Sequence, residues 1–115
     1  MKNETPVTPS GTFTVRPEHM TPTEFRIVSG LVRRAIAKGY TVSVIDDAFG
    51  HGDCTVQRSR DAAEIIGALA TTGGDLLRIR TADGARVGVI QLVYNGDDTV
   101  IADHTDNTDT VALVG

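Results

Sequence analysis

The sequence predicts an α+β protein whose mostly antiparallel sheet of five or six strands carries two helices on one face, in the order α-β-β-α-β-β-β. Two segments place apolar residues at helical spacing behind residues that favour helix starts. The last third of the chain instead alternates apolar and polar residues in three short runs. Asp83-Gly84 and Asn95-Gly96 separate these runs, and both dipeptides favour tight hairpins.

Length and composition indicate one small domain. With 115 residues, 40% of them hydrophobic, the chain can bury a core without metal ions or disulfides. Only 4% of the residues are aromatic and Trp is absent, so we expect a core of mainly Val, Ile, Leu and Ala. Residues 1–10 have little to bury and predict a flexible tail, followed by a single domain over residues 11–115.

The first helix has a strong predicted start. Thr21 is placed as its N-cap, Pro22 as its first residue and Glu24 as the third residue of a capping box. Gly39 is expected to end it. The residues expected to form its buried stripe are Phe25, Val28, Leu31, Val32, Ala35 and Ile36.

A hairpin and a second helix follow. Tyr40–Asp46 and Cys54–Arg58 alternate as strands and are expected to pair. Ser59 or Asp61 would cap the next helix, and Asp61 with Glu64 fits another capping box. Its inner stripe is predicted to be Ala62, Ile65, Ile66 and Leu69.

The ends of the chain offer two weaker strand patterns. Thr12–Arg16 could add an edge strand that Pro17 ends. Val111–Val114 predicts a final strand or a tail that docks on the sheet.

The closing strands, Leu76–Thr81, Arg86–Tyr94 and Thr99–His104, can be registered from their turns. Two-residue loops would place Leu77 opposite Ile90, and Ile90 opposite Ile101. The residues assigned to the core face are Leu77, Ile79, Ile90, Leu92 and Ile101.

The opposite face of these strands is the predicted binding surface. The same register puts Arg80, Val87 and His104 in one row. Arg78, Val89 and Ala102 fall in the next row, and Val100 is assigned to the same outer face. Cations among exposed valines suit a carboxylate, a phosphate or an acidic partner, whereas the plain alternative is a solvated sheet face. The residues predicted to bind are Arg78, Arg80, Gln91, His104, Val87 and Val89.

The loop around Gly50 gathers chemically active residues. His51 and Cys54 could form an activated nucleophile if the fold brought them together. The alternative is that Cys54 alternates with Val56 and points into the core.

An acidic segment near the end of the chain offers carboxylate oxygens of the kind that bind metal ions. Its spacing differs from that of a calcium-binding EF-hand loop, and one Cys with three separated His residues does not indicate zinc. We therefore expect neither a metal nor another cofactor. The segment contains Asp97, Asp98, Asp103, Asp106 and Asp109.

Charge and hydropathy limit the classes of partner and the cellular location that we expect. The net charge of −4 disfavours broad nucleic-acid binding. No apolar run reaches membrane-spanning length, and residues 1–6 lack the apolar region expected of a secretory signal. The single Cys fits a reducing compartment, so we expect a cytoplasmic protein that contacts no membrane.

Three stretches resemble small uncharacterised proteins carried by bacteria and their phages. They are residues 40–44, the helix entry at Arg58-Ser59, and residues 101–107. The resemblance spans about two-thirds of the chain and implies an accessory protein, without implying an activity or site residues.

These observations favour a non-enzymatic accessory protein that binds a protein partner, or itself, through the exposed face of the closing strands. The first alternative is a nucleic-acid-binding protein that uses Arg78, Arg80, Arg58 and Arg60. The second is a small enzyme built on the loop of His51 and Cys54.

Overall fold

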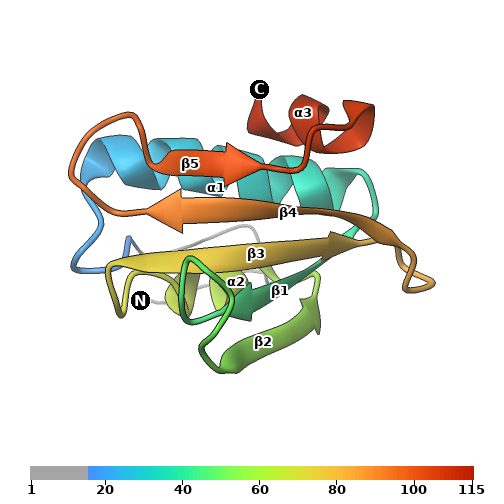
Figure 1. Cartoon of the computed structure of the whole chain (residues 1–115), viewed down its shortest axis with the longest axis horizontal. Helices are drawn as coiled ribbons and strands as arrows, with labels where there is room; N and C mark the ends of the chain where they lie inside the picture. Colours follow the sequence, from blue (N-terminus) through green and yellow to red (C-terminus); the bar gives the residue numbers. More distant parts are fainter. Residues whose placement is uncertain (1–15) are drawn as a thin grey trace, which may run out of the picture.

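The computed structural model describes residues 16–115 as one five-stranded antiparallel sheet with three helices (Figure 1). The strand order is β2-β1-β3-β4-β5. The predicted tail and residues 12–15 of the predicted edge strand lie outside the described residues. The elements are α1 (Pro22–Ala37), β1 (Thr41–Ile45), β2 (Cys54–Ser59), α2 (Ala62–Gly67), β3 (Gly74–Arg80), β4 (Arg86–Val93), β5 (Ile101–His104) and α3 (Thr108–Val114).

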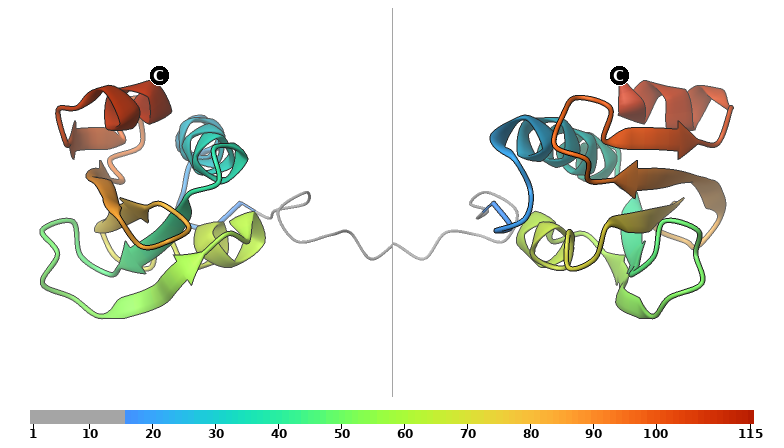
Figure 2. Two further views of the ribbon diagram at one scale, coloured as in Figure 1. Left: turned by 90° about the vertical axis from the view of Figure 1, so that its right-hand side faces the viewer. Right: turned by 60° about the vertical axis from the view of Figure 1, so that its left-hand side comes forward.

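Two layers make up the fold. Figure 2 shows α1 and α2 on the same face of the sheet, while the loop between β1 and β2 stands on the other side. The core fills the space between the sheet and these helices, and Val, Ile, Leu and Ala dominate it as the composition predicts. The predicted α+β class and the two helices on one face are therefore confirmed, and the second face of the sheet stays open.

The start of α1 is the predicted capping box. The Thr21 hydroxyl accepts from the Glu24 amide at 3.2 Å, and the Glu24 carboxylate accepts from the Thr21 amide at 3.0 Å. Gly39 follows the helix with a φ of +84°, a conformation that glycine adopts without strain. The predicted stripe is buried at Val28, Leu31, Val32 and Ala35, and half-buried at Phe25 and Ile36.

The start of α2 differs from the predicted capping box. Asp61 caps the helix by accepting from the amides of Ala63 and Glu64. The Glu64 carboxylate accepts from the Ser59 hydroxyl at 2.6 Å, instead of closing the box on Asp61. The same Ser59 oxygen accepts from the Asp61 amide, so Ser59 joins the end of β2 to the helix.

The β3–β4 hairpin keeps the predicted register away from its turn. Leu77 pairs with Ile90 and Ile79 with Gly88, as expected. The turn has three residues instead of two, because only Gly84 takes a positive φ, of +96°. Arg80 consequently pairs with Arg86, and Val87 becomes the extra residue of a bulge.

The predicted two-residue turn at Asn95-Gly96 is wrong. Such a turn needs positive φ at both residues, and only Gly96 has it. The Gly96 amide donates to the buried Glu24 carboxylate at 2.8 Å, which fixes a longer loop that Val93 and Val100 close. Ile90 therefore pairs with His104 instead of Ile101.

The register change exchanges two side chains of the last strand segment. Val100 is fully buried, although it was placed on the outer face. Ile101 pairs with Leu92 and is only half-buried against the core. The other four predicted core residues of these strands, Leu77, Ile79, Ile90 and Leu92, are buried.

The predicted final strand at residues 111–114 is wrong, because these residues belong to α3. The Asn107 side chain caps this helix by accepting from the Thr110 amide at 2.8 Å. Gly88 lets the helix approach β4, since a side chain there would overlap Thr110. Leu113 is buried, and its carbonyl accepts from Nε of Arg34 at 2.8 Å, which joins α3 to α1.

Candidate functional site

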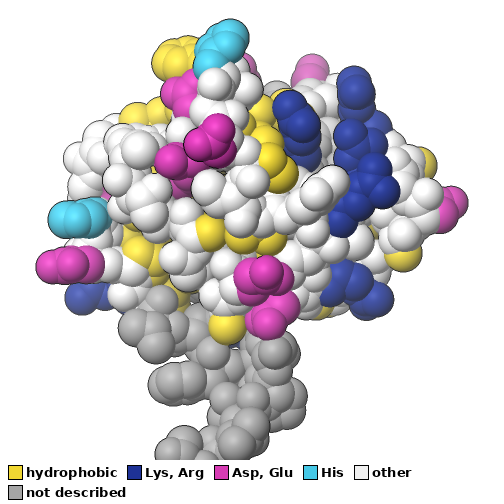
Figure 3. Space-filling model, turned by 90° about the horizontal axis from the view of Figure 1, so that it is seen from below, with side chains coloured by type: hydrophobic (Ala, Val, Ile, Leu, Met, Phe, Trp, Pro, Cys, Tyr) yellow, Lys and Arg dark blue, Asp and Glu magenta, His cyan; other side chains and the backbone are white. Residues whose placement is uncertain are grey.

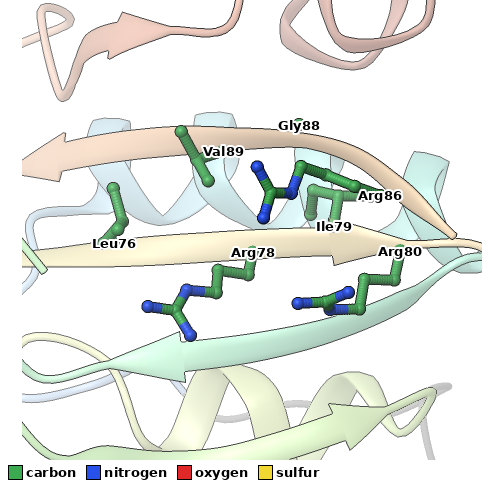
Figure 4. A pocket seen from close by; sticks show the side chains of 7 residues that line it. All are labelled: Leu76, Arg78, Ile79, Arg80, Arg86, Gly88 and Val89. Carbon is green, nitrogen blue, oxygen red and sulfur yellow. The ribbon is translucent and has the colours of Figure 1, made fainter. Parts of the chain in front are cut away.

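The open face of the sheet carries a hollow lined by arginines. Arg78 and Arg80 come from β3, as predicted, and Arg86 comes from the start of β4. Figure 4 shows their three side chains over the sheet, with Leu76 and Val89 beside them. The hollow has a volume of about 350 Å³.

A fourth arginine reaches the same region through an irregular backbone. Arg58 has a φ of +50°, within a bulge where β2 is out of register with β1. Its amide donates to the Ser43 hydroxyl at 2.9 Å. A methyl group placed on Gly84 would lie 3.5 Å from Nη1 of Arg58, and the Gly84 carbonyl accepts from Nη1 of Arg80 at 3.1 Å. We call Arg58, Arg78, Arg80 and Arg86 the arginine cluster.

The cluster carries uncompensated positive charge. Among the described residues, none of its four side chains forms an ion pair with a carboxylate. Arg80 and Arg86 are direct cross-strand partners, an arrangement in which like charges destabilise a sheet. Seen from the β2 side in Figure 3, Lys and Arg side chains gather at one end of the molecule, next to hydrophobic ones. The arrangement favours an anionic ligand.

A second hollow adjoins the first one. It shares Leu76 and Val89 with the first hollow and has a volume of about 450 Å³. Phe49, whose side chain is 76% exposed, forms one of its walls. The Gln91 amide nitrogen donates to the Ala48 carbonyl at 3.0 Å and holds this loop against the sheet. The two hollows therefore meet at Leu76 and Val89, and we call them together the trough.

Most of the predicted binding residues border the trough. Arg78, Arg80 and Val89 line its first part, and Val89, Gln91 and His104 line its second part. Placing Val87 on this face was wrong: the bulge turns it into the core, where it is 7% exposed. His104 does not share a row with Arg80, because β5 pairs in a different register.

The sequence pattern did not assign three residues of this surface to the binding face. The sequence pattern assigned Arg86 to neither face of the sheet. The three-residue turn and the bulge direct its side chain outward. Arg58 entered only the nucleic-acid alternative, and its strained backbone has no sequence signal of its own. Phe49 lies in the same loop as His51 and Cys54, and its exposed ring belongs to the trough. Arg60, also part of the nucleic-acid alternative, is exposed between β2 and the N-cap of α2.

The structure does not join the loop residues His51 and Cys54 as a hydrogen-bonded pair. Both are exposed, and within residues 16–115 no hydrogen bond joins them. The Cys54 thiol donates to the Val56 carbonyl at 3.3 Å. The alternative of Cys54 in the core is also wrong, because a register shift between Val44 and Ile45 breaks its alternation with Val56.

Asp75 of β3 has a buried carboxyl group. Asp75 accepts from the Tyr94 hydroxyl at 2.7 Å and from the Ala70 amide at 2.9 Å through the same oxygen. Burial raises the pKa of Asp75, although these two hydrogen bonds oppose the shift. Burial and the nearby Asp75 charge raise the pKa of Tyr94, which keeps its hydroxyl protonated as a donor. The pair joins the segment that follows α2 to β3 and to the residue after β4, and it stands apart from the trough.

Two acidic residues of the last third, Asp97 and Asp103, accept hydrogen bonds from nearby backbone amides. Asp97 accepts from the Thr99 amide at 2.9 Å and from its hydroxyl, and the hydroxyl bond lowers the pKa of Asp97. Across residues 16–115, no three His, Cys, Asp or Glu side chains are grouped to hold a metal ion. Over the same residues, every helix is too short or too polar to cross a membrane.

Comparisons of this chain with protein-family models, with curated proteins and with solved structures find no match. The arginine cluster and the trough are therefore the features from which a function can be inferred. Both lie on the face of the sheet that α1 and α2 leave open.

Proposed function

We propose that this protein is a non-enzymatic interaction module that binds an acidic segment of a protein partner through the open face of its sheet. One observation carries the proposal. Four arginines from three strands converge on this face, and no described carboxylate neutralises them. The resemblance noted above adds that the module would be an accessory protein of a bacterium or a phage, and the single Cys favours a cytoplasmic location.

The arginine cluster is unfavourable for the stability of the unbound protein. Like charges in neighbouring strands destabilise the isolated protein, and an anionic partner removes this repulsion when it binds. The whole chain has a net charge of −4, so the cluster is a local concentration of positive charge on an acidic protein. Arginine and aromatic side chains are enriched in protein interfaces, and this face presents both.

A charge-reversal experiment tests this proposal. The double variant Arg78→Glu/Arg80→Glu is compared with Arg26→Glu/Lys38→Glu, which makes the same charge change on exposed residues of α1 and its C-cap. The probe is a fluorescent decaglutamate peptide, measured by anisotropy at several salt concentrations. We expect the first variant to lose at least about tenfold in affinity, and the control to lose about twofold. Equal losses in both variants would contradict a specific role for this face.

A second candidate function is binding of single-stranded nucleic acid. The exposed ring of Phe49 favours it, because bases stack on aromatic side chains while arginines hold phosphates. The probe is a ten-nucleotide oligothymidylate, and this function predicts an affinity that falls steeply with salt. Tighter binding of this probe than of the acidic peptide, lost in Arg78→Glu/Arg80→Glu, would favour this candidate.

A further inference from the structure

The trough has ends of opposite character. Its first end contains the guanidinium groups of Arg78, Arg80 and Arg86, and its second end contains the Phe49 ring. We propose that its occupant is an extended peptide in which two acidic residues and one large apolar residue stand at alternate positions. This inference rests on the proposed function and specifies the partner's sequence.

The spacing of β3 sets the spacing of the peptide. Arg80, Arg78 and Leu76 alternate along one strand, so their side chains leave the open face about 7 Å apart. Every second side chain of an extended peptide has the same spacing. A peptide lying along the trough can therefore set one acidic side chain near Arg80 and the next near Arg78. Its next side chain on that face then reaches Leu76, which the first and second hollows share.

The second end of the trough is suited to an apolar side chain. Leu76 and Val89 form its floor, and Phe49 and Ala48 form a wall above them. Phe49 is the larger of the two exposed large hydrophobic residues that the structure describes. A Phe or Leu side chain inserted here would cover the Phe49 ring and remove apolar surface from water.

Charges around the second end favour a peptide over a nucleic acid. Asp46 and Asp47 line a further depression on which Phe49 also borders, and Asp103 lines the second hollow. In this region their carboxylates make no ion pair with a described cation. A phosphate backbone carries its charge along its whole length and would be repelled here, whereas a peptide can be acidic at one end only.

Three labelled probes test the inference with the full chain. The first peptide is Glu-Ser-Glu-Ser-Phe-Ser, the second replaces its Phe with Ser, and the third probe is the ten-nucleotide oligothymidylate. We expect the first peptide to bind about tenfold more tightly than the second, which corresponds to about 1.4 kcal/mol. In the Phe49→Ala protein this ratio should fall below about threefold.

The controls separate failure of the inference from failure of the proposed function. Phe49 is exposed, so Phe49→Ala should fold, and its unfolding transition is measured alongside. Equal binding of both peptides would overturn the inference and leave the proposed function standing. Binding of neither peptide would overturn both. Preferential binding of oligothymidylate would overturn both in favour of a nucleic-acid ligand.

Discussion

At the scale of single residues, Arg58 is the least ordinary position on the open face. A non-glycine residue with a φ of +50° is strained by about 1–3 kcal/mol, and here the strain accompanies a guanidinium held against Gly84. Strained backbone gathers where function requires a particular side-chain direction. The bulge also lets Ser59 turn inward, where it joins β2 to α2, so it serves the fold as well as the face.

Substitution of Arg58 separates these two roles. Arg58→Gly should be more stable than Arg58→Ala by about 1 kcal/mol, because glycine adopts positive φ without strain. Both variants should bind decaglutamate equally weakly, since both lack the guanidinium. Urea unfolding and peptide anisotropy provide the two measurements. Equal free energies of unfolding for the two variants would show that the backbone of Arg58 is not strained. Wild-type affinity in either variant would show that Arg58 takes no part in binding.

Asp75 makes a residue-scale prediction about pH. Its pKa in the fold is raised above the ordinary 3.8, so the unfolded chain gives up its proton at lower pH. Its contribution to stability is therefore fully present below about pH 3.8 and is lost as pH rises through the raised value. The unfolding free energy of the wild type, minus that of Asp75→Asn, should fall from pH 4 upward. A difference that stays constant with pH, or rises, would contradict the assignment.

At the scale of elements, the sequence predicted the strands better than their connections. Hydrophobic alternation correctly separated Leu77, Ile79, Ile90 and Leu92 from Arg78 and Arg80. The turn dipeptides located the turns, but within each dipeptide only the glycine, Gly84 or Gly96, has a positive φ. Residues distant in sequence decide the rest, as where Glu24 binds the Gly96 amide. Such contacts leave no local pattern, and for that reason Val87 and Val100 were assigned to the wrong face.

The pairing of β3 with β4 allows a prediction about charge. Arg86→Gln removes a like charge directly opposite Arg80, so it should raise the free energy of unfolding by about 0.2–1 kcal/mol. The gain should shrink in high salt, while affinity for decaglutamate falls. Urea unfolding at low and high salt checks the first effect. A variant that is less stable than wild type at low salt would show that Arg86 has a stabilising partner.

At the scale of the whole molecule, helices cover one face of the sheet and leave the other face open for the proposed binding. The covered face holds the core beneath α1 and α2, and the fold class and helix placement followed from sequence alone. The open face was predicted as a binding surface through Arg78 and Arg80, but its trough was not. The trough needs Arg86 and Phe49, which a bulge and a loop bring beside β3, while the bulge of β2 places Arg58 near Gly84.

Mapping of an acidic peptide by nuclear magnetic resonance tests the central claim most directly. Addition of Glu-Ser-Glu-Ser-Phe-Ser to the ¹⁵N-labelled protein should shift the amide signals of β3, the first half of β4 and residues 46–49. Signals of α1 and α3 should stay in place, because these helices lie away from the open face. Shifts confined to the helices, or no shifts at a saturating peptide concentration, would contradict binding through the arginine cluster.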